Sequence, residues 1–173
     1  MPMDIETSRL ILHAVDEFEA RRILARAPGP RDTWAADYPF AGDIAAIDSF
    51  LRATEEHGEQ RPFGHYQIIR AADGLAVGGA GFKGPPDDGN VELGYGLAPS
   101  ARGHGYASEA VTALLILAAA NGVAAVLADT TDDNVASQRT LVSAGFTLVG
   151  THAGLRRYRA GAPGPLHTKG LPN

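Results

Sequence analysis

The chain contains a strand, a glycine turn and a helix in direct succession, between residues 90 and 122. Apolar residues alternate from Val91 to Leu97, which is the two-residue period of a strand with one buried face. The turn Arg102-Gly103-His104-Gly105-Tyr106-Ala107 follows, and then an Ala- and Leu-rich run from Ser108 to Ala120 that favours a helix. A glycine turn that opens a helix gathers unpaired backbone N–H groups at the positive end of the helix dipole. The segment therefore predicts an anion site and a ligand that carries phosphate groups.

Length and composition indicate one globular domain. The 173 residues are 45% hydrophobic, which is enough for a substantial core. No run of about 18 uncharged apolar residues occurs, so we expect no membrane span, and the acidic start Met1–Glu6 does not resemble a signal peptide. The chain has no cysteine, which excludes disulfides and thiolate chemistry and fits a cytoplasmic enzyme.

Other chemistries have little support in the sequence. The net charge of −5 argues against a nucleic-acid binder, and the six histidines are scattered without metal-ligand spacing, so we expect no metal. No Gly-x-Ser-x-Gly segment marks a hydrolase nucleophile. The turn at Gly103 and Gly105 lacks the third glycine of a dinucleotide-binding fingerprint.

The order of predicted elements is a strand, two helices, three strands, a helix, a strand, a helix and two strands. Asp16 is expected to cap the first helix, with Phe18, Ile23 and Leu24 turned inward, and Asp43 to start the second. An antiparallel meander followed by strand–helix–strand units predicts an α/β (α+β) domain over residues 1–160. We expect a mixed, mostly antiparallel sheet of about seven strands with about four helices, and a flexible tail over residues 161–173.

The element order and three motifs resemble the GNAT family of acyl-CoA N-acyltransferases, in particular the branch that acetylates ribosomal-protein N-termini. Arg102-x-x-Gly105-x-Ala107 is similar to the pyrophosphate loop of that family. The second motif, Asn134-Val135-Ala136-Ser137-Gln138-Arg139, is closed by Ala144-Gly145-Phe146, and the opening Thr7-Ser8-Arg9-Leu10-Ile11-Leu12 also looks like this branch.

The resemblance implies acetyl-CoA as cosubstrate and a GNAT-like fold in which two central strands splay apart. Backbone groups near Leu97 and Pro99 would then bond to pantetheine in the gap. Glycines at 94 and 96 would let it lie close to the strand. The N–H groups of Gly103, His104, Gly105, Tyr106 and Ala107 would hold the pyrophosphate, and Arg102 either pairs with phosphate or fixes the loop.

Three further residues are candidates for proton transfer or for holding the coenzyme. Glu92 is either the base that deprotonates the acceptor amine or a structural carboxylate that bonds a neighbouring strand. Asn134 either only caps its helix or also bonds the pantetheine arm through its amide. Ser137 is the candidate donor to the leaving thiolate, because Leu141 stands where many family members have a tyrosine.

The expected reaction is acetyl transfer from acetyl-CoA to a primary amine by direct attack. A protein N-terminal α-amine is the first acceptor, a small amine such as an antibiotic or polyamine is the second, and a non-catalytic acyl-CoA- or drug-binding module is a third alternative. Trp34 and Tyr38, with the second helix and contributions from the closing hairpin, are expected to form the acceptor wall. The acids between Asp37 and Glu59 are either solvated surface or a wall that attracts a cationic acceptor. We expect no nucleic-acid or membrane partner, and a homodimer is left open.

Overall fold

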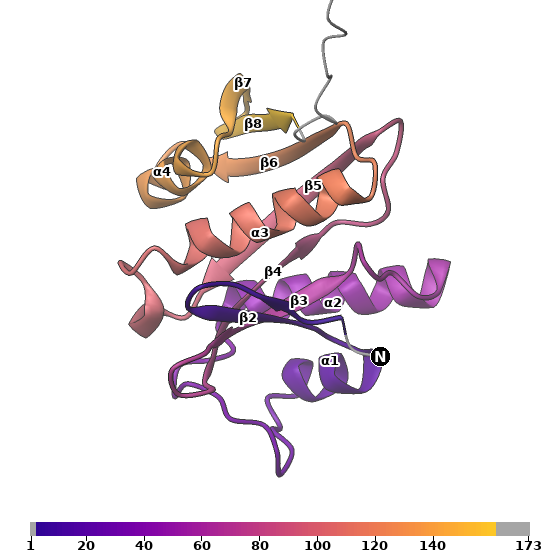
Figure 1. Ribbon diagram of the computed structural model, residues 1–173, viewed down its shortest axis with the longest axis vertical. Helices are drawn as coiled ribbons and strands as arrows, with labels where there is room; N and C mark the ends of the chain where they lie inside the picture. The colour runs from indigo at the N-terminus through magenta and orange to yellow at the C-terminus, as the bar shows by residue number, and fades with distance from the viewer. Residues whose placement is uncertain (1–2, 162–173) are drawn as a thin grey trace, which may run out of the picture.

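Eight strands form one sheet in the computed structural model, which describes residues 3–161, and four α-helices cover the two faces of that sheet (Figure 1). The strands are β1 (Ile5–Glu6), β2 (Leu10–Ala14), β3 (His65–Arg70), β4 (Ala76–Phe82), β5 (Asn90–Leu97), β6 (Ala125–Thr131), β7 (Thr147–His152) and β8 (Leu155–Gly161). The helices are α1 (Glu17–Leu24), α2 (Ala41–His57), α3 (Tyr106–Ala120) and α4 (Val135–Ser143), with a short 3-10 turn, η1 (Pro99–Ala101), before α3.

The sheet order is β1-β2-β3-β4-β5-β6-β8-β7. All neighbouring strands are antiparallel except β5 and β6, so the predicted mixed, mostly antiparallel sheet is confirmed. The sequence predicted seven strands, and the additional one is β1, a two-residue strand at the edge.

The central strands β5 and β6 pair only where they begin. Their parallel register joins Asn90, Val91 and Glu92 to Ala125, Val126 and Leu127, whereas β5 stays paired with β4 as far as Leu97. From Leu93 onward one edge of β5 therefore has no strand beside it. This is the splay that the sequence resemblance implied.

Each face of the sheet has its own core. Helices α3 and α4 cover one face, where Leu114 and Leu141 pack with Leu12, Ile68 and Leu93 from the strands. Helices α1 and α2 cover the other face through a smaller cluster: Val15, Ala20, Ile23, Tyr38, Ile47, Leu51, Ala76 and Ala98. Each face of the sheet is thus covered by its own pair of helices with its own core cluster.

Three details of the predicted elements need correction. Phe18 and Leu24 do not turn inward, because α1 is short and buries only Ala20 and Ile23; the side chain of Phe18 is 78% exposed. Helix α2 begins at Ala41, so Asp43 lies inside its first turn and accepts a hydrogen bond from the Phe40 N–H. Strand β8 runs to Gly161, and the rest of the predicted tail, residues 162–173, lies outside the described residues.

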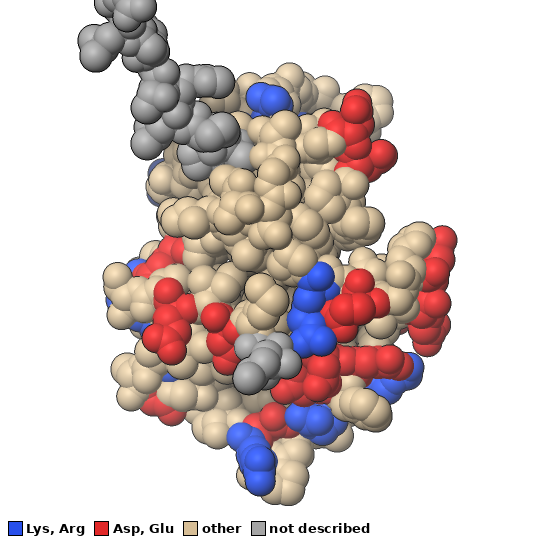
Figure 2. All heavy atoms as spheres, turned by 45° about the vertical axis from the view of Figure 1, so that its right-hand side comes forward, with Lys and Arg blue, Asp and Glu red and all other residues tan. Residues whose placement is uncertain are grey.

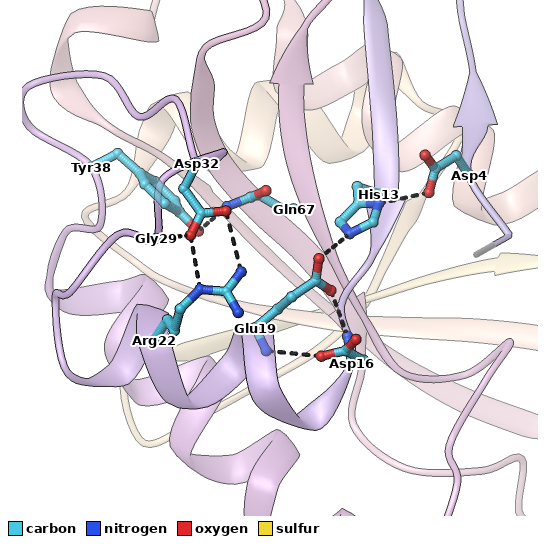
Figure 3. A network of polar contacts seen from close by, with 9 residues as sticks. All are labelled: Asp4, His13, Asp16, Glu19, Arg22, Gly29, Asp32, Tyr38 and Gln67. Carbon is cyan, nitrogen blue, oxygen red and sulfur yellow. Dashed lines mark hydrogen bonds and ion pairs between the residues drawn. The ribbon is translucent and has the colours of Figure 1, made fainter. Parts of the chain in front are cut away.

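A network of polar contacts joins the edge of the sheet to α1 (Figure 3). The ring of His13 lies between Asp4 and Glu19, with 2.8 Å from Nδ1 to Asp4 and 2.8 Å from Nε2 to Glu19. Glu19 also accepts the backbone N–H of Asp16, which in turn caps the helix as predicted. The hydrogen bond to Glu19 and the nearby acids raise the pKa of His13 from 6.5 to about 9 against the opposing effect of burial.

This raised pKa predicts a stability that depends on pH. Because the pKa of His13 is higher in the folded state, the stabilisation is complete below pH 6.5 and is lost as pH rises through about 9. His13→Gln should lower the free energy of unfolding by about 2 kcal/mol at low pH, after allowance for the partly exposed partners. Denaturant unfolding on both sides of this pH window measures the difference, which should vanish on the alkaline side. A constant difference across the window would contradict the ion-pair role.

Candidate functional site

A cavity of about 1220 Å³ opens where β5 separates from β6. It runs from the N-terminal turn of α3 and the first turns of α4, past β4 and β5, to the side of α2. The cavity thus connects the two faces of the sheet. Its lining includes Leu97, Arg102, Gly103, Gly105, Tyr106, Ala107, Asn134 and Ser137 from the predicted coenzyme site, and it lacks Pro99 and His104.

The glycine turn before α3 has the geometry of an anion site. Gly103 and Gly105 have φ angles of 83° and 79°, a left-handed conformation that residues with side chains rarely adopt. Gly105 is the N-cap of α3, and no side chain caps the helix there. The N–H groups of the first turn have no acceptor within the helix, and they lie at the positive end of its dipole beside the cavity.

Arg9 fastens this turn to the rest of the domain. Its guanidinium donates to the carbonyl of His104 at 2.7 Å and to Glu109 at 2.7 Å, and it lies 4.8 Å from the centre of the Tyr106 ring. Glu109 also accepts from the hydroxyl of Thr7. The sequence presented Thr7–Arg9 only as part of a family resemblance, and its contact with a turn about a hundred residues away is visible only in the fold.

Arg102 holds the strand end and an aromatic ring. Its Nε donates to the carbonyl of Leu97 at 3.1 Å, and its guanidinium lies 5.6 Å from the centre of the Phe40 ring. These contacts correspond to the loop-fixing alternative. A contact between Arg102 and phosphate stays a prediction.

The open edge of β5 presents backbone groups to the cavity. The carbonyl of Glu92 accepts from Lys83 and the N–H of Ala98 donates to Val77, so the even-numbered residues bond to β4. Because the backbone alternates, the N–H and C=O groups of Leu93, Tyr95 and Leu97 point toward the gap. An extended ligand there could bond to this edge as a neighbouring strand would.

The space beside Gly96 is filled by a side chain of the protein itself. A Cβ on Gly96 would lie 2.5 Å from Cζ of Phe40, so the glycine makes room for this ring. The prediction that Gly96 makes room for a pantetheine chain is therefore corrected, because the ring of Phe40 occupies the space beside Gly96. The unpaired edge of β5 faces β6 instead.

Tyr95 and Ser137 meet across the gap. The two hydroxyls are 2.7 Å apart, so either can donate to the other, and the Tyr95 hydroxyl also lies 3.1 Å from the Ser137 carbonyl as an alternative acceptor. Asn134 Oδ1 accepts the N–H of Ser137 at 3.0 Å, which confirms its role as the cap of α4. Tyr95 was missed as a site residue because its place in the alternating strand indicated only packing, while Leu141 is buried in the core.

Glu92 lies outside the lining of the cavity. Its carboxylate accepts from Lys83 at 2.9 Å and lies 3.8 Å from Arg157. It stands where β5 and β6 are still paired. This position matches the structural alternative, and a role for Glu92 as base stays a prediction without a contact to support it.

Trp34 and Tyr38 also lie away from the cavity. Their rings pack edge to face with centres 5.4 Å apart, and Tyr38 is buried between α1, α2 and the sheet, where its hydroxyl accepts from Gln67 (Figure 3). The structure thus places the predicted acceptor residues in a core. Of the elements predicted to form the acceptor wall, α2 borders the cavity, whereas the closing hairpin of β7 and β8 does not.

The acids between Asp37 and Glu59 do not form a continuous wall. Asp37 accepts from the N–H and hydroxyl of Ser100, Asp48 pairs with Arg52, and Glu59 pairs with Arg61 at 2.7 Å. Figure 2 shows acidic groups interspersed with Lys and Arg on one face of the molecule. These contacts favour the solvated-surface alternative, and only Asp43 and Glu56 of this group border the cavity.

Comparisons with known proteins agree with this geometry. Residues 9–147 match the model of the acetyltransferase (GNAT) domain. An uncharacterized N-acetyltransferase of Bacillus subtilis (strain 168), YjdG, is 32% identical over 114 residues, which cover 65% of this chain and 68% of that protein.

Solved structures share the fold. A GNAT-family acetyltransferase from Bacillus anthracis has a TM-score of 0.66 at 16% identity, with 92% of this chain and 99% of that chain covered. The ribosomal L7/L12 alpha-N-protein acetyltransferase RimL, solved in complex with coenzyme A, has a TM-score of 0.66 at 18% identity and covers 91% of this chain and 97% of its own. The chain belongs to the GNAT family of acetyltransferases, and it is an N-acetyltransferase by that membership. In the part of the chain that the structure describes, no helix is long and apolar enough to cross a membrane.

The glycine turn yields a binding prediction. Gly105→Val would force a branched side chain into a left-handed conformation at the N-cap of α3 and displace its N–H groups, so acetyl-CoA affinity should fall at least about tenfold. Calorimetric titration with acetyl-CoA measures the change. Gly122→Val is the matched control, because Gly122 has a similar φ of 78° at the opposite end of α3 and has open space around it. Equal affinities in the two folded variants would contradict a phosphate site at this turn.

Proposed function

We propose that this cavity binds acetyl-CoA and that the protein transfers its acetyl group to a primary amine by direct attack. The observation that carries the proposal is that the N-terminus of α3 and the open edge of β5 line one and the same cavity. The uncapped N-terminus of α3 offers donors for the pyrophosphate, and the open edge of β5 offers a backbone ladder for the pantetheine arm. Asn134 and the N–H groups from Gly103 to Ala107 complete the proposed coenzyme site.

The N–H groups on the open edge of β5 also suit the chemical step. A thioester carbonyl that accepts from one of them is polarised, and the oxyanion of the tetrahedral intermediate is stabilised by the same donor. These donors are held by the β4–β5 ladder, so they need no rearrangement when the charge develops. Backbone donors of β5 therefore supply the electrostatic part of the mechanism.

Tyr95 and Ser137 are proposed to stabilise the leaving thiolate together. Burial raises the pKa of the Tyr95 phenol, in spite of its hydrogen bond to Ser137, so the phenol stays protonated at neutral pH. When the phenol donates to Ser137 Oγ rather than to the Ser137 carbonyl, the Ser137 hydroxyl is free to donate to sulfur. This pair takes the place of the tyrosine that the family resemblance led us to seek at Leu141.

The first acceptor that we propose is a protein N-terminal α-amine. The support is the motif resemblance to the ribosomal-protein branch and the shared fold with RimL, a ribosomal L7/L12 alpha-N-protein acetyltransferase. A small amine is the second candidate, because the cavity is open along α2 and both kinds of acceptor end in a primary amine. Action in the cytoplasm and a homodimer stay predictions.

A thiol-release assay with acetyl-CoA tests this function. Three acceptor pools are compared: peptides with free N-termini, polyamines, and aminoglycosides. Release of coenzyme A with one pool, with the acetylated amine found by mass spectrometry, is the expected result. Tight acetyl-CoA binding without turnover on any pool would instead support the binding-module alternative.

The Tyr95–Ser137 pair leads to a kinetic prediction. Tyr95→Phe and Ser137→Ala should each lower kcat by roughly 10- to 100-fold and leave acetyl-CoA affinity unchanged, because the hydroxyls act after the coenzyme is bound. The double variant should lose little more than either single one, since the two groups act as a unit. Tyr158→Phe is the control, a buried tyrosine of β8 outside the cavity lining. A wild-type kcat in Tyr95→Phe would remove this pair from the mechanism.

A further inference from the structure

The side of the cavity next to α2 ends in a floor of buried polar side chains. Asp43, Gln60 and His65 are only 3%, 8% and 7% exposed, and all three border the cavity. Within the described residues, Nε2 of His65 and Oε1 of Gln60 have no hydrogen-bond partner. Buried polar atoms are normally satisfied, so two unsatisfied atoms on side chains that border one cavity point to a ligand with hydrogen-bond donors.

Asp43 and His65 come together over Gly79 of β4. A Cβ on Gly79 would lie 2.6 Å from Nε2 of His65 and 3.0 Å from Oδ1 of Asp43, so the bare glycine is what allows the two groups to approach. The other oxygen of Asp43 accepts the N–H of Phe40 at 3.2 Å, which fixes the carboxylate at the first turn of α2. One carboxylate oxygen and one imidazole nitrogen therefore converge from different elements.

The charges around this floor leave the carboxylate without a direct cationic partner. Among the described residues no ion pair involves Asp43, and Arg26, whose charge acts on it, donates instead to the carbonyl of Pro39. Tyr38 and His65 are its other titratable neighbours. The remaining titratable residues that border the cavity are Arg52, Glu56, His57, Lys83, Tyr95, Arg102, Tyr106 and Arg139.

Burial sets the protonation of both groups. It raises the pKa of Asp43 from 3.8 to about 7, and it lowers the pKa of His65 from 6.5 to about 4. At neutral pH the imidazole is therefore neutral and has a lone pair to offer. A carboxylate that titrates near neutral pH is matched to proton transfer under working conditions.

We propose that Asp43 is the general base of the reaction and that His65 and Gln60 position the acceptor amine beside it. The inference rests on the proposed acetyl transfer and names the acceptor end of the same cavity. The ligand is a primary ammonium group, whose three N–H donors match in number the carboxylate oxygen, Nε2 of His65 and Oε1 of Gln60. The aromatic rings of Phe40 and Phe50 border the cavity here and suit an aliphatic stem behind the nitrogen.

The proton balance of the step is complete. The ammonium gives one proton to Asp43, and the neutral nitrogen attacks the thioester carbon to form the C–N bond. The C–S bond then breaks with its electron pair on sulfur. Sulfur takes a proton from Ser137, the second proton of the nitrogen passes through solvent to restore the Ser137 hydroxyl, and Asp43 returns the first proton to solvent. One amide, one thiol and one free proton result.

The test compares Asp43→Asn with Asp48→Asn, the same substitution on a half-buried residue of the same helix that does not border the cavity. The probes are a pentapeptide with a free N-terminus and spermidine, each with acetyl-CoA. Asp43→Asn should lower kcat/KM about 100-fold at neutral pH and abolish the ionisation near 7 in the pH profile. Acetyl-CoA affinity should not change, and Asp48→Asn should match the wild type.

The melting temperature of Asp43→Asn distinguishes a catalytic role of Asp43 from a purely structural one. Since the pKa of Asp43 is raised by folding, the ionised carboxylate destabilises the protein as pH rises through about 7. Asp43→Asn should therefore melt higher than the wild type on the alkaline side while it is catalytically impaired. His65→Phe gives an independent arm: the KM for the amine should rise at least about fivefold with acetyl-CoA affinity retained.

A binding measurement distinguishes failure of this inference from failure of the proposed function. The same two amines are titrated calorimetrically into the protein saturated with coenzyme A. Amine binding that is lost in Asp43→Asn or His65→Phe supports the site even where no turnover occurs. Wild-type amine affinity and kinetics in both variants would overturn it, and so would a loss of rate in Glu92→Gln with none in Asp43→Asn.

Discussion

The separation of β5 from β6 is the constraint on which the site depends. The two strands share three register pairs and then part, so the middle of the sheet contains an edge that a continuous sheet would not have. Unpaired strand edges are normally covered or avoided. Here the edge opens onto the cavity, and the same opening exposes the N-terminus of α3 on one side and the floor below α2 on the other.

The two packed layers hold opposite ends of the proposed reaction. The α3–α4 side provides the glycine turn and Ser137, which meets Tyr95 of β5, and Arg9 bonds both to that turn and to Glu109. The α1–α2 layer provides Asp43 against the glycines of β4. Burying unsatisfied groups on this floor lowers stability, and the network around His13 adds stability at neutral pH in the same layer. Coenzyme and amine would thus approach the gap from different faces.

Local patterns in the sequence predicted the local structure well. Alternation indicated the strands, Asp16 and Asn134 were recognised as helix caps, and the glycines from 103 to 105 indicated a turn that opens a helix. Contacts between distant segments were not predictable in this way. The bond from Tyr95 to Ser137 spans 42 residues, and Asp43 meets His65 only because β4 is bare at Gly79. Aromatic side chains in a loop suit either a binding site or a core, and the sequence alone does not distinguish the two for Trp34 and Tyr38. In the fold both pack in the smaller core cluster.

Backbone amide chemical shifts, measured by NMR during titration with coenzyme A, test the central claim most directly. If the parted strands hold the coenzyme, the largest shifts should fall on Gly103 through Ala107 and on the amides of Leu93, Tyr95 and Leu97, whose N–H groups face the gap. Amides of Gly94 and Gly96, which bond to β4, should move less. Shifts confined to other surfaces, with both of these segments unchanged, would contradict the account.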